Sequence, residues 1–146
     1  MALQLLEFVH DEDPEEVVLH EPHHDLESFI YVLIYAIYRH ESEALQESAE
    51  WARWKKVDAE MQAVFGHTSL DKIIRSRDAA LRVIRQIPAG PLYKCVRALM
   101  AAVTQQNPAY IEDPRQFLTY EFVLVTLDEA ITATLELEEP VVALSA

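Results

Sequence analysis

The chain has 146 residues, 51% of them hydrophobic, with only two glycines and a formal net charge of -13. This length fits one domain, and the apolar half can fill a core. The negative charge argues against nucleic acid as a partner, so none is expected, because phosphate binding needs a positive local field. A single cysteine, Cys95, excludes an internal disulfide framework and suits a reducing compartment, so we expect the cytoplasm or nucleus. The N-terminus has neither the basic start nor the long apolar core of a secretory signal.

The charge is distributed unevenly along the chain. Residues 1–50 hold 13 acidic residues and one basic residue, residues 51–106 hold 10 basic and 4 acidic, and residues 107–146 hold 8 acidic and one basic. One interpretation is that the acidic outer segments fold back on the basic middle. The other is a basic patch for nucleic acid, which the overall sign disfavours.

The first third of the chain predicts a polar loop followed by a long helix. Residues 1–8 are apolar and short, and residues 9–24 form an acidic loop with Pro14 and Pro22. A helix is expected from about residue 25 to residue 40. Asp25 stands where an N-cap belongs, so its carboxylate is expected to accept from the backbone N–H of Glu27 or Ser28. Glu27 also suits the positive helix end. We therefore assign structural roles to Asp25, Glu27 and Ser28.

Four more helices are predicted downstream. One covers roughly residues 43–65, and a third follows a cap at Thr68 or Ser69, with an apolar stripe at helical spacing. The stretch "PAGP" ends that helix, and its last residue, Pro91, is expected to begin a fourth. Asp113 and Pro114 are expected to start a last helix, which runs to about Leu135 and leaves residues 136–146 as a tail. The sequence therefore predicts an all-α single domain, 1–146, with about five helices around one hydrophobic helix.

That central helix contains ten consecutive apolar or aromatic residues, 29–38. The run is too short to span a bilayer, which needs about 20 residues, so no membrane partner is expected. A helix that is apolar all round is typical of a buried strut that other helices cover.

The stretch "HHDLESFIYVLIYAIY" resembles the central helix of the C-terminal lobe of protein kinases, and the fungal-type protein kinase family most closely. "MALQLL" is similar to the element that follows the activation segment in that family. The helix bearing Trp51 and Trp54 and the later "FLTYEFVLVTL" also resemble it, in the same order. The resemblance implies the helical C-lobe subdomain of a kinase-like fold. In that family the residue matching Asp25 holds the backbone of the catalytic loop.

The departures from a whole kinase are as informative. The chain has no Gly-rich phosphate loop, no strand lysine with a helix glutamate, no His-Arg-Asp loop and no Asp-Phe-Gly motif. Phosphoryl transfer depends on those parts, so we expect no catalytic residue and no cofactor. The resemblance implies a truncated kinase-like domain, either a non-catalytic remnant or a protein-binding module. The alternative is the C-terminal part of an active serine/threonine-type kinase whose N-terminal half is missing from this chain.

Other candidate sites have simpler structural explanations. His20, His23, His24 and Asp25 have the side chains of a metal site, but two adjacent histidines at a helix start do not easily face one ion, so we predict no metal site. Cys95 is interpreted as a small core residue rather than a nucleophile. Ser28 lacks the Gly-x-Ser-x-Gly elbow of a hydrolase. "HDEDPEE" lacks the glycine and spacing of a calcium loop.

The expected mode of action is binding to a protein. With only four other helices to cover it, the central helix is expected to keep an open apolar side. We predict a homodimer or a protein partner at that side, with Tyr31, Tyr35 and Tyr38 as contact residues. Alternatively, residues 1–8 and 141–146 fold over the gap.

Overall fold

The computed structural model describes residues 20–106 and 116–138, without the side chains of residues 78–83. These residues form five helices: α2 (Pro22–Glu47), α3 (Trp51–Phe65), α4 (Leu70–Val83), α5 (Pro91–Gln106) and α6 (Tyr120–Glu138). They contain no strand, which confirms the all-α prediction for the described part of the chain. The expected segment 1–8, most of the loop 9–24, the Asp113–Pro114 cap and most of the tail 136–146 lie outside the described residues.

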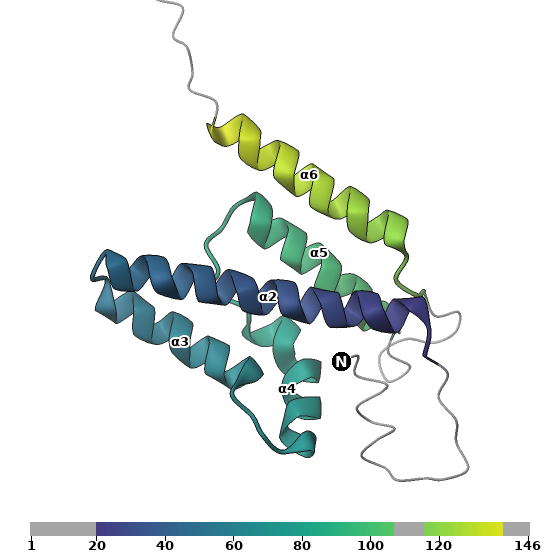
Figure 1. Ribbon diagram of the computed structural model, residues 1–146, viewed down its shortest axis with the longest axis horizontal. Coiled ribbons are helices and arrows are strands. Elements are labelled where there is room, and N and C mark those ends of the chain that lie inside the picture. The colour runs from purple at the N-terminus through teal and green to yellow at the C-terminus, as the bar shows by residue number, and fades with distance from the viewer. Residues whose placement is uncertain (1–19, 107–115, 139–146) are drawn as a thin grey trace, which may run out of the picture.

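Figure 1 shows α2 crossing the middle of the molecule, with α3 returning beside it as an antiparallel neighbour. Helix α5 packs on α2, and α6 runs along the outer side of α5. Helix α4 lies between α3 and α5 in the chain and contacts both of those helices. The arrangement therefore places α2 and α5 at the centre, and it leaves α6 with α5 as its main neighbour.

The core forms where α2, α3 and α5 meet. Ile30, Ile34 and Tyr38 of α2 are each 0% exposed, and their spacing of four residues puts them on one side of that helix. Val57 of α3 and Leu99 of α5 are equally buried against them. The central position expected for this apolar helix is therefore observed, although only one of its sides is buried.

The start of α2 differs from the prediction. The helix begins at Pro22 with Glu21 as its N-cap, so Asp25 lies inside the first turn and the Asp25 N-cap prediction is wrong. Proline suits this position because it has no N–H to leave unpaired and its φ is preset for a helix. The Glu21 N–H donates to Nδ1 of His24 at 3.0 Å, which adds a side-chain cap from within the turn.

The end of α2 also lies later than predicted, at Glu47 rather than near residue 40. The chain leaves the helix through a turn in which the Ala49 N–H donates to the Gln46 carbonyl at 3.1 Å and the Glu50 N–H donates to the Leu45 carbonyl at 2.9 Å. These are the two bonds of a Schellman motif. Ala49 takes a φ of 58° there, a conformation that glycine usually supplies.

The other boundaries agree in part. Helix α3 ends at Phe65 as predicted, but it begins at Trp51 rather than near residue 43. Helix α4 begins at Leu70, and the carbonyl of Ser69 accepts from the Ile73 N–H at 3.0 Å, as expected for a helix that starts there. Helix α6 begins at Tyr120 and continues to Glu138, so it starts later and ends later than predicted.

A buried polar chain positions the start of α6 against α2. Glu27 is 4% exposed, and its Oε2 accepts from Nε2 of Gln106 at 3.4 Å. Oε1 of the same Gln106 accepts from the Leu118 N–H at 2.7 Å. Glu27 therefore connects three segments of the fold, a role that its position in a helix start did not predict.

Candidate functional site

The histidine cluster at the start of α2 is a packed helix end. Nε2 of His20 lies 3.1 Å from Oδ1 of Asp25, and Nδ1 of His23 lies 3.2 Å from Oε2 of Glu21. The His23 ring packs on the rings of His24 (4.1 Å between centroids) and Phe117 (4.5 Å). Within the described residues, no group of three His, Cys, Asp or Glu side chains is placed to hold a metal ion.

The environments of His23 and His24 favour their neutral imidazoles. Burial lowers the pKa of both His23 and His24, and a neighbouring histidine lowers each further, while Glu21 opposes the shift of both and Asp25 also opposes that of His24. Ser28 donates from Oγ to the His24 carbonyl at 2.9 Å, a bond within the helix that leaves no activated hydroxyl. Asp25, Glu27 and Ser28 are thus all engaged in holding this end of the fold.

A second polar site joins α2, α3 and the segment after α4. Oε1 of Glu60 accepts from the Tyr38 hydroxyl (2.5 Å) and from the backbone N–H groups of Arg85 (2.7 Å) and Gln86 (2.9 Å). Burial raises the pKa of Tyr38, and the hydrogen bond to Glu60 raises it further. Sequence reasoning missed this site, since Glu60 and Tyr38 are 22 positions apart and no local pattern links them.

Arg77 of α4 occupies a third internal site. Its guanidinium lies 4.3 Å from the Tyr31 ring centroid and 4.8 Å from that of Phe65. Its buried Nε and Nη1 have no hydrogen-bond partner within the described part of the structure. Burial lowers the pKa of Arg77, while Tyr31 and Glu27 oppose that shift. The cation–π contacts with the Tyr31 and Phe65 rings offset part of the free-energy cost of burying the guanidinium charge.

Cys95 lines a pocket of about 310 Å³ between α5 and α6. Alanines make up much of the lining, and Lys94 and Glu129 add charge to it. The thiol is only 3% exposed, and burial raises its pKa, which disfavours the thiolate that nucleophilic chemistry requires. The interpretation of Cys95 as a core residue therefore fits its environment.

The open side of α2 is made of different residues from those predicted. Tyr31 is 3% exposed and Tyr38 is 0% exposed, so the prediction that they contribute to a contact surface is wrong. Val32 is 65% exposed and Phe29 is 44% exposed, and exposed Ala36 continues their line. We call these three residues the α2 face. Tyr35, which is 44% exposed, lies at the border of this face and packs edge-on against Phe65 at 5.3 Å.

Helix α6 exposes more apolar surface than α2. Only Val123 of this helix is buried, while Leu127 and Ala130 are partly buried against the core. At 100° per residue, four exposed side chains fall within an arc of about 60° beside that buried line. We call them the α6 stripe: Tyr120 (56% exposed), Leu124 (64%), Ile131 (58%) and Leu135 (58%). The sequence pattern predicts this helix but assigns no contact surface to it.

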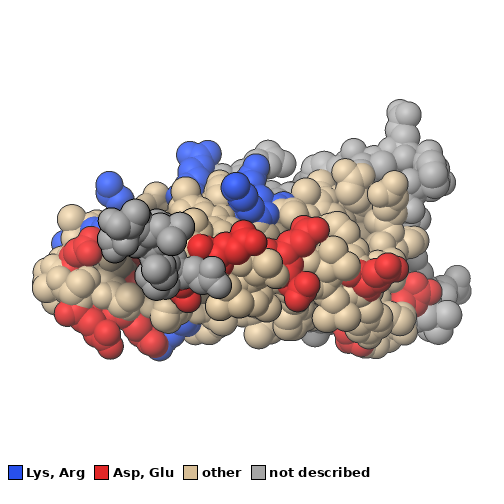
Figure 2. Space-filling model, turned by 90° about the horizontal axis from the view of Figure 1, so that it is seen from above, with Lys and Arg blue, Asp and Glu red and all other residues tan. Residues whose placement is uncertain are grey.

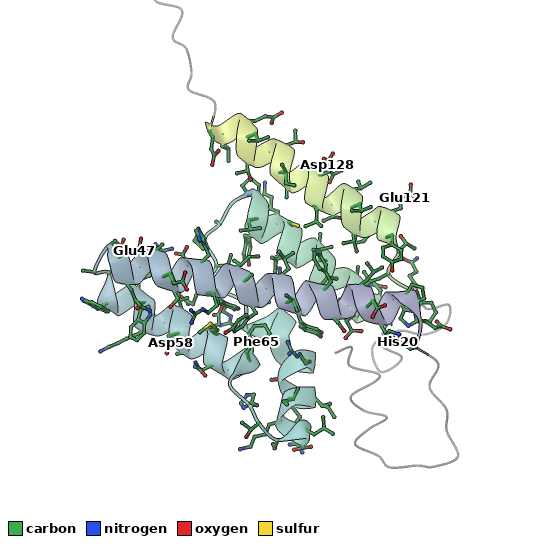
Figure 3. The ribbon with its side chains drawn as sticks, in the orientation of Figure 1. His20, Glu47, Asp58, Phe65, Glu121 and Asp128 are labelled. Carbon is green, nitrogen blue, oxygen red and sulfur yellow. The ribbon has the colours of Figure 1, made fainter. Side chains whose placement is uncertain are left out.

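Helix α6 carries several carboxylates and no basic side chain of its own. Residues 116–138 include five acidic residues and no basic residue: Glu121, Asp128, Glu129, Glu136 and Glu138. Figure 3 shows Glu121 and Asp128 on the side of α6 that points away from α5. Figure 2 looks from above, the side on which α6 lies in Figure 1. Acidic side chains run along this view, while most of the visible Lys and Arg lie towards its upper edge.

These acidic groups differ from those on the central helices. Arg39 pairs with Glu43 at 2.8 Å, and Arg53 of α3 pairs with Glu41 at 2.6 Å. In contrast, no acidic side chain of α6 has an ion pair with any other described residue. Helix α6 therefore carries an exposed apolar stripe, and the carboxylates at its side have no ion pair among the described residues.

Comparisons with protein-family models, with curated proteins and with solved structures found no match to this chain. None of the described helices is long and apolar enough to cross a membrane. The internal polar sites bind neighbouring elements, whereas the α2 face and the α6 stripe are exposed and can contact another molecule.

Proposed function

We propose that this chain is a non-catalytic, kinase-lobe-like helical domain that acts by binding another protein inside the cell. The observation that carries the proposal is the α2 face. The helix at the centre of the fold exposes Phe29 and Val32 on the side opposite its buried line. Contiguous apolar surface of this kind on a protein marks a place where a partner binds.

The electrostatics near the α2 face allow contact with a protein. Beyond Ala36 the same side of α2 carries Arg39 and Glu43, which pair with each other at 2.8 Å. The apolar patch is therefore followed by a locally neutral polar rim, the arrangement found around the buried centre of protein interfaces. A second copy of the chain or a different protein both fit this face.

The first experiment is sedimentation at micromolar concentrations together with binding of a hydrophobic dye. We expect either a species heavier than 16.7 kDa or a 16.7 kDa species that binds the dye. The double variant Phe29→Ser/Val32→Ser should reduce the association or the dye signal, whereas Glu47→Ser, at the far exposed end of α2, should not. A single 16.7 kDa species without dye binding would contradict the proposal.

The second experiment addresses catalysis. The chain contains none of the sequence motifs that hold phosphates and magnesium in kinases. Incubation with labelled ATP, magnesium and generic protein substrates should therefore show no transfer above a buffer blank. Phosphate incorporation that survives repurification would contradict the non-catalytic proposal.

The second candidate function is the C-terminal part of an active serine/threonine-type kinase. An exposed α2 face is also expected if helices encoded before this chain normally cover it. Sequencing the DNA upstream of the Met1 codon separates the two candidates. An in-frame His-Arg-Asp loop and Asp-Phe-Gly motif would favour the active kinase.

A further inference from the structure

The α6 stripe is a separate surface from the α2 face, and its chemistry is more specific. Tyr120, Leu124, Ile131 and Leu135 are each more than half exposed on a helix whose nearby carboxylates have no described ion-pair partner. We infer that the α6 stripe binds a basic amphipathic helix of another protein. This inference deepens the proposed binding function by naming a second surface and the class of its partner.

The shape of the stripe fits a helix. Its members lie at positions i, i+4, i+11 and i+15, so they form a ridge of about 22 Å along one side of α6. Leu127, partly buried, fills the middle of the same side. An amphipathic partner helix has its own apolar ridge, at positions i, i+3, i+4 and i+7. The side chains of that ridge can pack into the grooves beside the α6 stripe, as in other helix pairs. An extended peptide has no sheet edge to join in the described part of the chain.

The charge of α6 selects among the possible occupants. Asp128 lies next to Leu124 on the helix surface, about 40° away, and Glu121 lies about 20° beyond it. A partner helix with Lys or Arg beside its apolar residues would bring cations to these carboxylates. A second copy docked through its own α6 would instead bring two sets of five carboxylates together. Anionic lipid surfaces and nucleic acids are repelled in the same way.

The test uses the full chain and a synthetic probe, since the natural partner is not identified. The probe is a fluorescent helical peptide of about 18 residues with Leu on one side and Lys on the others. Two comparison peptides isolate the contributions: one with each Lys replaced by Glu, and one with the same composition but no helical periodicity. We expect the basic amphipathic peptide to bind at least about tenfold more tightly than either, with binding that weakens as salt is raised.

Matched variants on α6 locate the site. Leu124→Ser/Ile131→Ser should weaken peptide binding about tenfold, because each substitution removes an exposed apolar group that binding would cover. Val125→Ser is the control, since Val125 is 50% exposed on the same helix but about 100° away from Leu124. Asp128→Asn should weaken binding and reduce its salt dependence more than Glu129→Gln, which changes a carboxylate on the pocket side of α6. Circular dichroism melts confirm that each variant is folded.

The failures of this inference and of the proposed function are distinguishable. If Phe29→Ser/Val32→Ser abolishes peptide binding and Leu124→Ser/Ile131→Ser does not, the α2 face is the site and the α6 inference is overturned. A homodimer in sedimentation that Leu124→Ser/Ile131→Ser disrupts would show a second copy on the stripe and also overturn it. Equal binding of the acidic peptide, or equal effects of Leu124→Ser/Ile131→Ser and Val125→Ser, would exclude a charge-selected site at the stripe.

Discussion

Replacing Tyr38 with phenylalanine tests the buried bond that connects α2 to α3. The Tyr38 hydroxyl is 2.5 Å from Oε1 of Glu60, on a side chain that is 0% exposed. A hydrogen bond to a charged group contributes about 1.5–3 kcal/mol. Glu60 keeps its two backbone donors, Arg85 and Gln86, when the hydroxyl is removed, so no charge is left unpaired. We therefore expect Tyr38→Phe to lower the free energy of unfolding by about 2 kcal/mol at neutral pH.

The same substitution has a second effect at alkaline pH. Burial raises the pKa of Tyr38 far above its value of about 10 in the unfolded chain. Above the unfolded pKa of about 10, the unfolded state releases the Tyr38 proton while the folded state keeps it, so the free energy of unfolding falls as pH rises. At one pH unit above the unfolded pKa, near pH 11, this loss amounts to about 1.4 kcal/mol, and Tyr38→Phe does not suffer it. The difference between the two proteins should shrink to about 0.6 kcal/mol there.

Urea unfolding followed by circular dichroism at about pH 8 and about pH 11 measures both values. Tyr35→Phe is the control for removing an exposed hydroxyl without a described hydrogen bond, and it should change the free energy by under about 0.5 kcal/mol at pH 8. A Tyr38→Phe difference that stays the same at both pH values would refute the role assigned to burial and Glu60.

Three further predictions concern α2 and its turns. Ala49→Gly should raise the free energy of unfolding by about 0.5–1 kcal/mol in urea titrations, because Ala49 holds a φ of 58° that costs an L-residue energy, and a loss of stability would contradict the turn described. Because burial lowers the pKa of His23 and His24, the unfolded state binds more protons than the folded state below about pH 6.5. The stability of the wild-type protein should therefore fall as the pH is lowered from about 6.5 to about 5. His23→Gln should reduce that slope, by at most about 1.4 kcal/mol per pH unit, and an unchanged slope in melts across this range would contradict the neutral cluster. Asp25→Asn should cost under about 1 kcal/mol in thermal melts, because it removes only a first-turn carboxylate that favours the positive helix end, and a larger loss would contradict this modest role.

Much of the helix order was predictable from local chemistry. Pro91 begins α5 and Ser69 precedes α4, because proline and serine satisfy or avoid the unpaired N–H groups of a first turn. The same rule, applied to Pro22, marks the true start of α2, and the choice of Asp25 placed the N-cap four residues later than Glu21. The end of α2 carried no such mark, since Ala49 occupies a turn position where glycine is the usual signal.

The candidate surfaces depended on tertiary packing. A run that is apolar on every side, such as residues 29–38, has no periodicity that distinguishes its buried side from its exposed side. Contacts with α3 and α5 bury Tyr31 and Tyr38 and leave Val32 open. Helix α6 has the same ambiguity, and only its single main neighbour, α5, decides that Leu124 and Ile131 face outward. Residue order and local capping thus determine where the helices lie in the chain, whereas the faces that they expose depend on which helices happen to cover them.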